Sequence, residues 1–231
     1  MAGRKAETAG MGSAVAVPTL DRVIAAAAEC QLAVLGGFTC EHAAGLPAGT
    51  RTLLLLGPLE PGFWPAVKAS DEWDGAPDPV DRWSRRVIGK LACDLVAKAL
   101  FPFGGPPYHA FTQWALRSGR VWQSPVRLLV HADQGLMVSF RGALALKEVL
   151  ALPPPRVRPC DACAKPCLTA CPVGALDEVD YDLPACHGHL STPEGKDCMS
   201  LGCAARRACP VSLGYARMPE QSAYHMRQFH K

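Results

Sequence analysis

The cysteines constrain the fold of this chain more than any other feature. Eight of its eleven cysteines lie between residues 160 and 209, in less than a quarter of the 231 residues. Four of them form the run Cys160-x2-Cys163-x3-Cys167-x3-Cys171, which is followed directly by a proline. The other four are Cys186, Cys198, Cys203 and Cys209, and Cys209-Pro-Val repeats Cys171-Pro-Val. Because a segment this small and polar has little apolar surface to bury, we expect bound metal to hold it together.

The spacing of the run predicts two [4Fe–4S] clusters. Bacterial ferredoxins use the run C-x2-C-x2-C-x3-C-P, and the present run is one residue longer. In two-cluster ferredoxins the fourth cysteine, before the proline, binds the other cluster. Applying that rule to both Cys-Pro pairs predicts two crossed groups with no thiol left over. Thiol set 1 contains Cys160, Cys163, Cys167 and Cys209, and thiol set 2 contains Cys171, Cys186, Cys198 and Cys203.

Two other uses of eight thiols have to be weighed. Two zinc sites of four cysteines also need eight thiolates, but zinc sites usually use separated C-x2-C pairs. Disulfides are typical of small secreted scaffolds, whereas this chain has enough apolar residues for a core and begins without an apolar signal segment. The remaining cysteines, Cys30, Cys40 and Cys93, are interpreted as small apolar side chains. Iron–sulfur binding is therefore the favoured interpretation.

Composition limits the partners and the compartment. Hydrophobic residues make up 49% of the chain and charged residues 19%, so a buried core is expected. The net charge of +3 is too small to indicate nucleic acid or an anionic membrane as a partner. No apolar run is long enough to span a bilayer. Oxygen-sensitive clusters and unpaired thiols predict a reducing, cytoplasmic location.

The chain before the cysteines predicts a layered α+β domain. Residues 1–17 are interpreted as a mobile leader, and residues 18–152 as the domain. Helices are expected from Leu20, capped by Thr19, and from Pro79, capped by Asp78. Residues 50–56 are expected to form a buried strand, and residues 32–35 a short apolar run that ends at the following two glycines. The proline-rich residues 153–159 are a stiff spacer, and residues 160–231 form the second domain.

A hairpin is expected near the end of the first domain. Residues 126–131 and 136–141 alternate as two strands across the turn at residues 132–135. This pairing places His131 and Arg141 on facing strands, where they are candidates for contacts to the phosphate or carboxamide of a cofactor. An equally good interpretation is a structural pair at the end of a sheet. His187 and His189, beside Cys186, are interpreted as groups near the cluster or at the surface, because the cysteines already suffice as ligands.

The cysteine segment also resembles a known family. The run from Cys160 to Leu176, the isolated Cys186 and the final Cys-Pro are similar to the dicluster ferredoxin domain of epoxyqueuosine reductases and of the related reductive dehalogenases. More loosely, residues 128–135 and 140–144 resemble the hairpin of the corrinoid-reductase domain of the cblC-type cobalamin chaperone. The resemblance implies a nitroreductase-like first domain, a small two-cluster ferredoxin-like second domain, and the same crossed sharing of ligands. The segment that surrounds the catalytic acid of the reductases is not found, so no residue is assigned that role.

Three functions are compatible with these features. The favoured one is an iron–sulfur protein with two [4Fe–4S] clusters that transfers electrons to or from a redox partner protein. The alternative is an oxidoreductase that uses cobalamin or a flavin in the first domain. The third is a domain in which the clusters only stabilise the fold.

Overall fold

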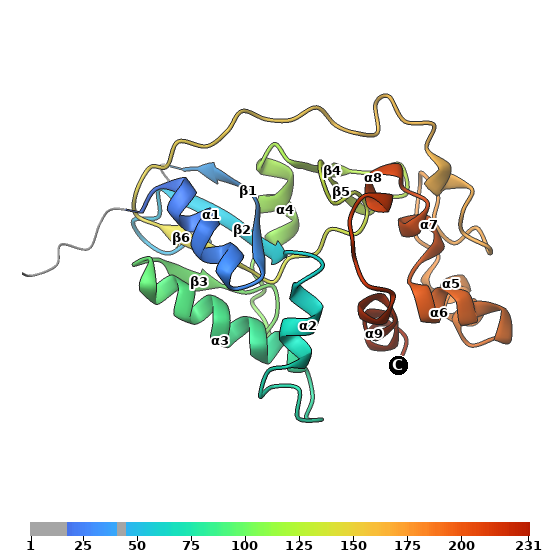
Figure 1. Cartoon of the computed structure of the whole chain (residues 1–231). Coiled ribbons are helices and arrows are strands. Elements are labelled where there is room, and N and C mark those ends of the chain that lie inside the picture. The colour runs from blue at the N-terminus through green and yellow to red at the C-terminus, as the bar shows by residue number, and fades with distance from the viewer. Residues whose placement is uncertain (1–17, 41–44) are drawn as a thin grey trace, which may run out of the picture.

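The computed structural model describes residues 18–40 and 45–231, so the leader predicted at 1–17 lies outside the described residues. The chain has a mixed α+β fold built on antiparallel strands, as the sequence predicted. Four strands form the main sheet in the order β1-β2-β6-β3, and two short strands, β4 and β5, pair separately. The sheet and its helices lie on one side of the molecule, and the cysteine-bearing helices lie on the other (Figure 1).

The main sheet is buried on both faces. Strand β2 (Thr52–Pro58) is central, between β1 (Leu32–Thr39) and β6 (Gly142–Leu146), and β3 (Lys98–Leu100) forms the far edge. Leu54 and Leu56 of β2 pack into one apolar core with three helices, α1 (Leu20–Glu29), α2 (Phe63–Lys68) and α3 (Pro79–Asp94). Leu53 and Leu55 pack into a second core with α4 (Phe111–Arg117). Two covered faces explain why β2 is a continuous apolar run, because alternate side chains point to opposite faces.

Several local predictions for this layer are confirmed, and two need correction. Thr19 accepts a hydrogen bond from the amide of Arg22 at 3.3 Å at the start of α1. Helix α3 begins at Pro79, but Asp78 has a φ of +53° and its side chain makes no capping hydrogen bond. Strand β1 does not end at the glycines. It continues through them with a change of register between Val34 and Gly36 in its pairing with β2.

The predicted hairpin is formed only at its turn, where His131 and Gly135 make a single antiparallel bridge with amide-to-carbonyl hydrogen bonds of 3.0 Å in both directions. Strand β5 (Leu129–His131) pairs with β4 (Val121–Gln123), and the chain from residue 136 leads into β6, which pairs with β2 and β3. The sequence indicated extended segments but did not identify their partners, because strand pairing depends on contacts between residues far apart in the chain.

Two polar contacts stabilise this layer. The buried hydroxyl of Thr52 donates to the carbonyl of Glu148 at 2.7 Å and accepts from the amide of Leu150 at 3.0 Å. The guanidinium of Arg86 on α3 binds the carboxylate of Glu72, with one contact at 2.9 Å. That contact holds the pKa of Glu72 at about 2, well below its ordinary value.

The cysteine segment shares a core with the chain that precedes the spacer. It contains six short helices, η1 (Pro166–Leu168), α5 (Leu183–Leu190), η2 (Pro193–Gly195), α6 (Lys196–Leu201), α7 (Ala204–Arg207) and α8 (Pro210–Leu213), followed by α9 (Pro219–Phe229). A third apolar core joins Val126, Val130 and Leu136 to residues of this segment. The proline-rich spacer runs over the outside of the molecule (Figure 1). Residues 121–137 therefore pack against the predicted second domain although they precede the spacer.

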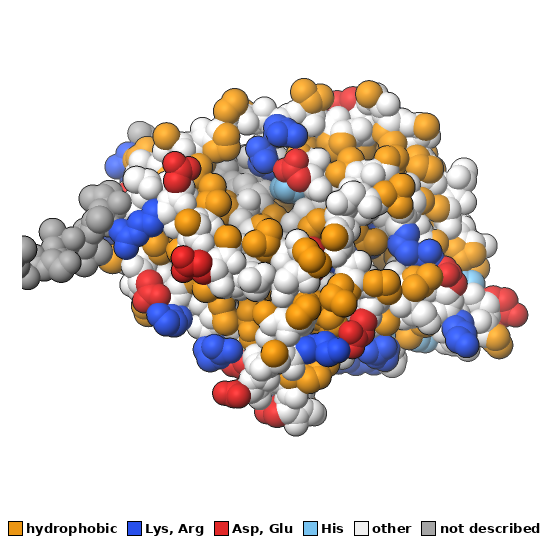
Figure 2. Space-filling view, in the orientation of Figure 1, with side chains coloured by type: hydrophobic (Ala, Val, Ile, Leu, Met, Phe, Trp, Pro, Cys, Tyr) orange, Lys and Arg blue, Asp and Glu red, His pale blue; other side chains and the backbone are white. Residues whose placement is uncertain are grey.

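Helix α9 also connects the two sides. Tyr224 packs on Trp64 of α2 with ring centroids 5.3 Å apart, and Lys68 of α2 donates to Glu220 at 2.7 Å. The face shown in Figure 2 carries Lys and Arg interspersed with Asp and Glu, without a large patch of one sign. No helix within the described residues is long and apolar enough to cross a membrane.

Candidate metal centres

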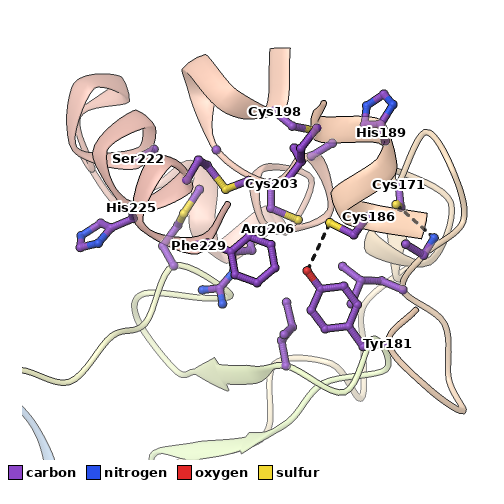
Figure 3. A pocket seen from close by; sticks show the side chains of 18 of the residues that line it. Cys171, Tyr181, Cys186, His189, Cys198, Cys203, Arg206, Ser222, His225 and Phe229 are labelled. Atoms are coloured by element: carbon purple, nitrogen blue, oxygen red, sulfur yellow. Dashed lines mark hydrogen bonds between the residues drawn. The ribbon is translucent and has the colours of Figure 1, made fainter. Parts of the chain in front are cut away.

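Thiol set 2 surrounds one cavity. Its four cysteines all line a cavity of about 310 Å³. Cys186 comes from α5, Cys198 from α6, Cys203 precedes α7, and Cys171 comes from the run of four. The sulfur atoms of Cys186 and Cys203 are turned toward each other (Figure 3). The structure therefore brings together the four thiols that the sequence assigned to set 2, including Cys171 from the distant run.

Thiol set 1 gathers at a second cavity. Cys160, Cys163 and Cys209 line a cavity of about 330 Å³. Cys167 is buried with Cys209 in the third apolar core. Burial raises the pKa of the Cys167 thiol, and charge on Cys209 or Cys160 raises it further. Cys209 thus lines a cavity together with the start of the run about fifty residues before it, whereas its sequence neighbour Cys203 lines the cavity of set 2.

The loop before β6 positions Cys209. Cys209 is the residue before α8, and Ser212 on that helix accepts a hydrogen bond from the amide of Leu136 at 2.9 Å. Gly135 has a φ of +58°, and a Cβ at that position would lie 2.5 Å from the Ser212 amide and 3.0 Å from the Cys209 sulfur. Glycine is needed there for both reasons. A contact between residues 135 and 212 therefore carries the last cysteine to set 1.

Burial raises the pKa of two thiols in each set. Burial raises the pKa of the Cys186 thiol, and charge on Cys203 or Cys171 raises it further. Burial likewise raises the pKa of the thiols of Cys160 and Cys198. Four thiolates cannot be held close together without a compensating cation, and thiolate is the form that binds soft metals. The donor chemistry of each set fits an iron–sulfur cluster.

Hydrogen-bond donors reach sulfurs of both thiol sets. The amide of Lys165 donates to Cys163 at 3.3 Å, and that of Ala175 donates to Cys171 at 3.3 Å. The hydroxyl of Tyr181 donates to Cys186 at 3.4 Å (Figure 3). Burial raises the pKa of Tyr181, so the hydroxyl keeps its proton and remains a donor. Donors of this kind stabilise negative charge on a ligand sulfur.

The two proposed cofactor residues lie apart and have partners within the chain. Nδ1 of His131 accepts from the amides of Asp133 at 3.1 Å and Gln134 at 3.2 Å, so Nε2 carries the proton and donates to the carbonyl of Leu35 at 2.9 Å. Arg141 forms an ion pair with Asp81 at 3.2 Å, and its guanidinium lies 5.6 Å from the centre of the Phe103 ring. These contacts agree with the structural interpretation of both residues.

The two histidines near Cys186 differ in their environment. His189 lines the cavity of set 2, whereas Nδ1 of His187 lies 2.7 Å from Nδ1 of His230 at the end of α9. No group of three or more His, Cys, Asp or Glu side chains in the described part of the chain converges closely enough to hold a single metal ion. Of the other cysteines, Cys40 is buried, Cys30 half-buried and Cys93 exposed, and all three lie outside both cavities.

Sequence reasoning missed the basic residues of the set 2 cavity. Arg206 and Arg217 both line it, and Arg206 lies between two predicted ligands, Cys203 and Cys209. The position of Arg206 between two predicted ligands was the one signal available in the sequence, because arginine is rarely found in buried segments. Comparison of the chain with protein-family models, with curated proteins and with solved structures found no match.

Proposed function

We propose that this chain binds two [4Fe–4S] clusters, one on each thiol set, and transfers electrons. The observation that supports the proposal is that the four thiols of set 2, including Cys171, line one cavity, whereas Cys160, Cys163 and Cys209 of set 1 line another. A cluster of this type, when bound, accepts and releases one electron at a time.

Three features of the chain support electron transfer rather than a purely structural role. Both thiol sets border the third apolar core, which contains Cys167 and Cys209 of set 1 and packs against Cys203 of set 2. The two sites therefore adjoin the same apolar core. The hydrogen bond from Tyr181 to Cys186 reaches a ligand atom directly, and such bonds tune reduction potentials. The third feature is the positive charge of Arg206 and Arg217 at the wall of the set 2 cavity.

We do not extend the proposal to cobalamin or flavin chemistry. The polar atoms of His131 and the guanidinium of Arg141, which were the candidates for such a cofactor, already bind other groups of the chain. A nitroreductase-like fold of the first 150 residues remains part of the proposal. It adds no cofactor to the proposal, because a shared fold does not carry a function with it.

Metal analysis of protein purified without oxygen tests the proposal. We expect about eight iron and about eight acid-labile sulfide per chain, because each cluster contains four of each. Dithionite should reduce the protein reversibly and produce EPR signals of two clusters. About two zinc ions per chain and no sulfide would instead support the zinc alternative. Clusters that dithionite cannot reduce reversibly would leave only the structural role.

A further inference from the structure

Two arginines at the set 2 cavity have no carboxylate partner. Arg206 donates from Nη1 to the carbonyl of Leu136 at 2.9 Å, and Arg217 donates from Nη1 to the carbonyl of Met137 at 3.1 Å. Both side chains line the cavity. Neither forms an ion pair with any residue that the structure describes, although the neighbouring Arg207 pairs with Asp197. A neutral carbonyl satisfies a donor but leaves the positive charge uncompensated.

The acid that acts on Arg217 is a weak counterion. The carboxyl of Glu60 influences Arg217, but burial raises the pKa of Glu60, which favours its neutral form. Nε of Arg217 is buried without a hydrogen-bond partner, and burial lowers the pKa of this guanidinium to about 10. A buried cation without an ion pair is costly, so Arg217 favours negative charge on other groups of the cavity.

The positive charges of the arginines also act on a histidine of the same cavity. His225 lines the cavity, and its pKa is lowered to about 2, first by burial and then by the charges of Arg217, Arg141 and Arg206. Among the cavity residues, the thiols of set 2 are the groups that can supply negative charge, and they do so only as thiolates bound to metal. The arginines and the thiols therefore face one space with complementary charges.

Thiol set 1 meets a different kind of cation. Arg158 lowers the pKa of the Cys160 thiol through its charge and through a side-chain hydrogen bond to it, but its side chain is 37% exposed and lies 3.7 Å from Asp161. Lys165, in the run itself, is exposed. Solvent and the partner carboxylate screen such charges. Set 1 therefore meets one half-exposed arginine that has a carboxylate nearby, whereas set 2 meets two arginines without an ion pair in the described part of the chain.

We propose that Arg206 and Arg217 are the counter-charges of the cofactor on thiol set 2 and that they raise its reduction potential above that of set 1. This inference rests on the proposed function. Reduction adds one electron, and so one negative charge, to a centre that is already negative because of its four thiolates. A guanidinium at the wall of the cavity stabilises the reduced form more than the oxidised form, because its attraction to the added charge is only partly screened there. Set 2 is thus the centre that takes up the first electron, whichever partner supplies it.

A redox titration of the holoprotein, monitored by EPR with dithionite as reductant, tests this order. The signals are assigned with Cys171→Ser, which removes a ligand of set 2, and Cys209→Ser, which removes one of set 1. In the wild type, the set 2 signal should appear at the higher potential. Arg206→Gln and Arg217→Gln should each lower the equilibrium constant for reduction of set 2 about tenfold, which is about 59 mV for one electron, and leave set 1 unchanged.

Two further variants separate charge from packing. Arg227→Gln removes the same charge from an exposed position of α9 outside the cavity and should move neither potential. Arg206→Lys keeps the charge and should keep most of the wild-type potential. Because the arginines contact different carbonyls, one variant remains informative if the other fails to fold. The inference is wrong if set 2 is reduced after set 1, or if the glutamine variants leave the set 2 potential at its wild-type value. Wild-type protein without iron would instead refute the proposed function, and this inference with it.

Discussion

Replacement of Cys209 by serine tests the crossed assignment of ligands. Cys209 is followed by α8 and lies closest in sequence to Cys203, but in space it lies with Cys160 and Cys167. The variant should therefore lose the cluster of set 1 and keep that of set 2. Iron should fall from about eight to about four atoms per chain, with an equal fall in sulfide. The buried hydroxyl adds a cost to folding of about 1–3 kcal/mol, which is small enough to leave a folded protein.

Double variants make this test quantitative. Cys160→Ser combined with Cys209→Ser should still retain about four iron atoms, because both residues belong to set 1. Cys198→Ser combined with Cys209→Ser should lose all iron, because one ligand is removed from each set. An assignment based on nearness in sequence predicts the opposite results, since it groups Cys198 with Cys209. Cys93→Ser is the matched control, because Cys93 is exposed at the end of α3 and lies outside both sets, so iron should stay at about eight.

The assay is iron and sulfide quantitation on protein purified without oxygen, with EPR of the dithionite-reduced samples to identify the remaining cluster. If Cys209→Ser spares the signal that Cys160→Ser removes, the crossed assignment is wrong. If the single variant loses both clusters while the Cys93 control keeps them, the two sites are not independent and the expected retention of set 2 is refuted.

Three further predictions concern the fold. Gly135→Ala should destabilise the protein by about 1–3 kcal/mol in a denaturant titration, because alanine meets both a positive φ and the amide of Ser212. Gly75→Ala is its control, since that position has a positive φ but open space, and an equal loss would mean that the contact is unimportant. Thr52→Val should cost about 1–3 kcal/mol because it leaves a buried carbonyl and a buried amide unpaired, and an unchanged denaturation midpoint would contradict this. Glu72→Gln should lower stability by less than about 1 kcal/mol near neutral pH, because its arginine partner is largely exposed. The pKa of Glu72 is lower in the folded protein than in the unfolded chain. The extra stability of the wild type over Glu72→Gln is therefore fully present above pH 4.5 and is lost as the pH falls toward about 2. An undiminished difference in stability at pH 2 would refute the assignment.

The sequence by itself determined the local features of this protein. The apolar run at β2, the start of α3 at Pro79 and the cap at Thr19 follow from periodicity and from the chemistry of single residues. The grouping of the eight thiols was predicted from spacing and from the two Cys-Pro pairs; in the structure the thiols of set 2 line one cavity, three thiols of set 1 line another, and Cys167 lies in the adjoining apolar core. Whether those groups bind clusters stays a prediction.

The tertiary structure decided which distant residues meet. It paired β5 with β4 instead of with residues 136–141, and it separated His131 from Arg141. It also carried Arg206 and Arg217 to the wall of the set 2 cavity and packed residues 121–137 against the cysteine segment. Local preference fixes the conformation of a few neighbouring residues, whereas partners far along the chain are selected by burial and by complementary charge, which arise only once the whole chain is packed.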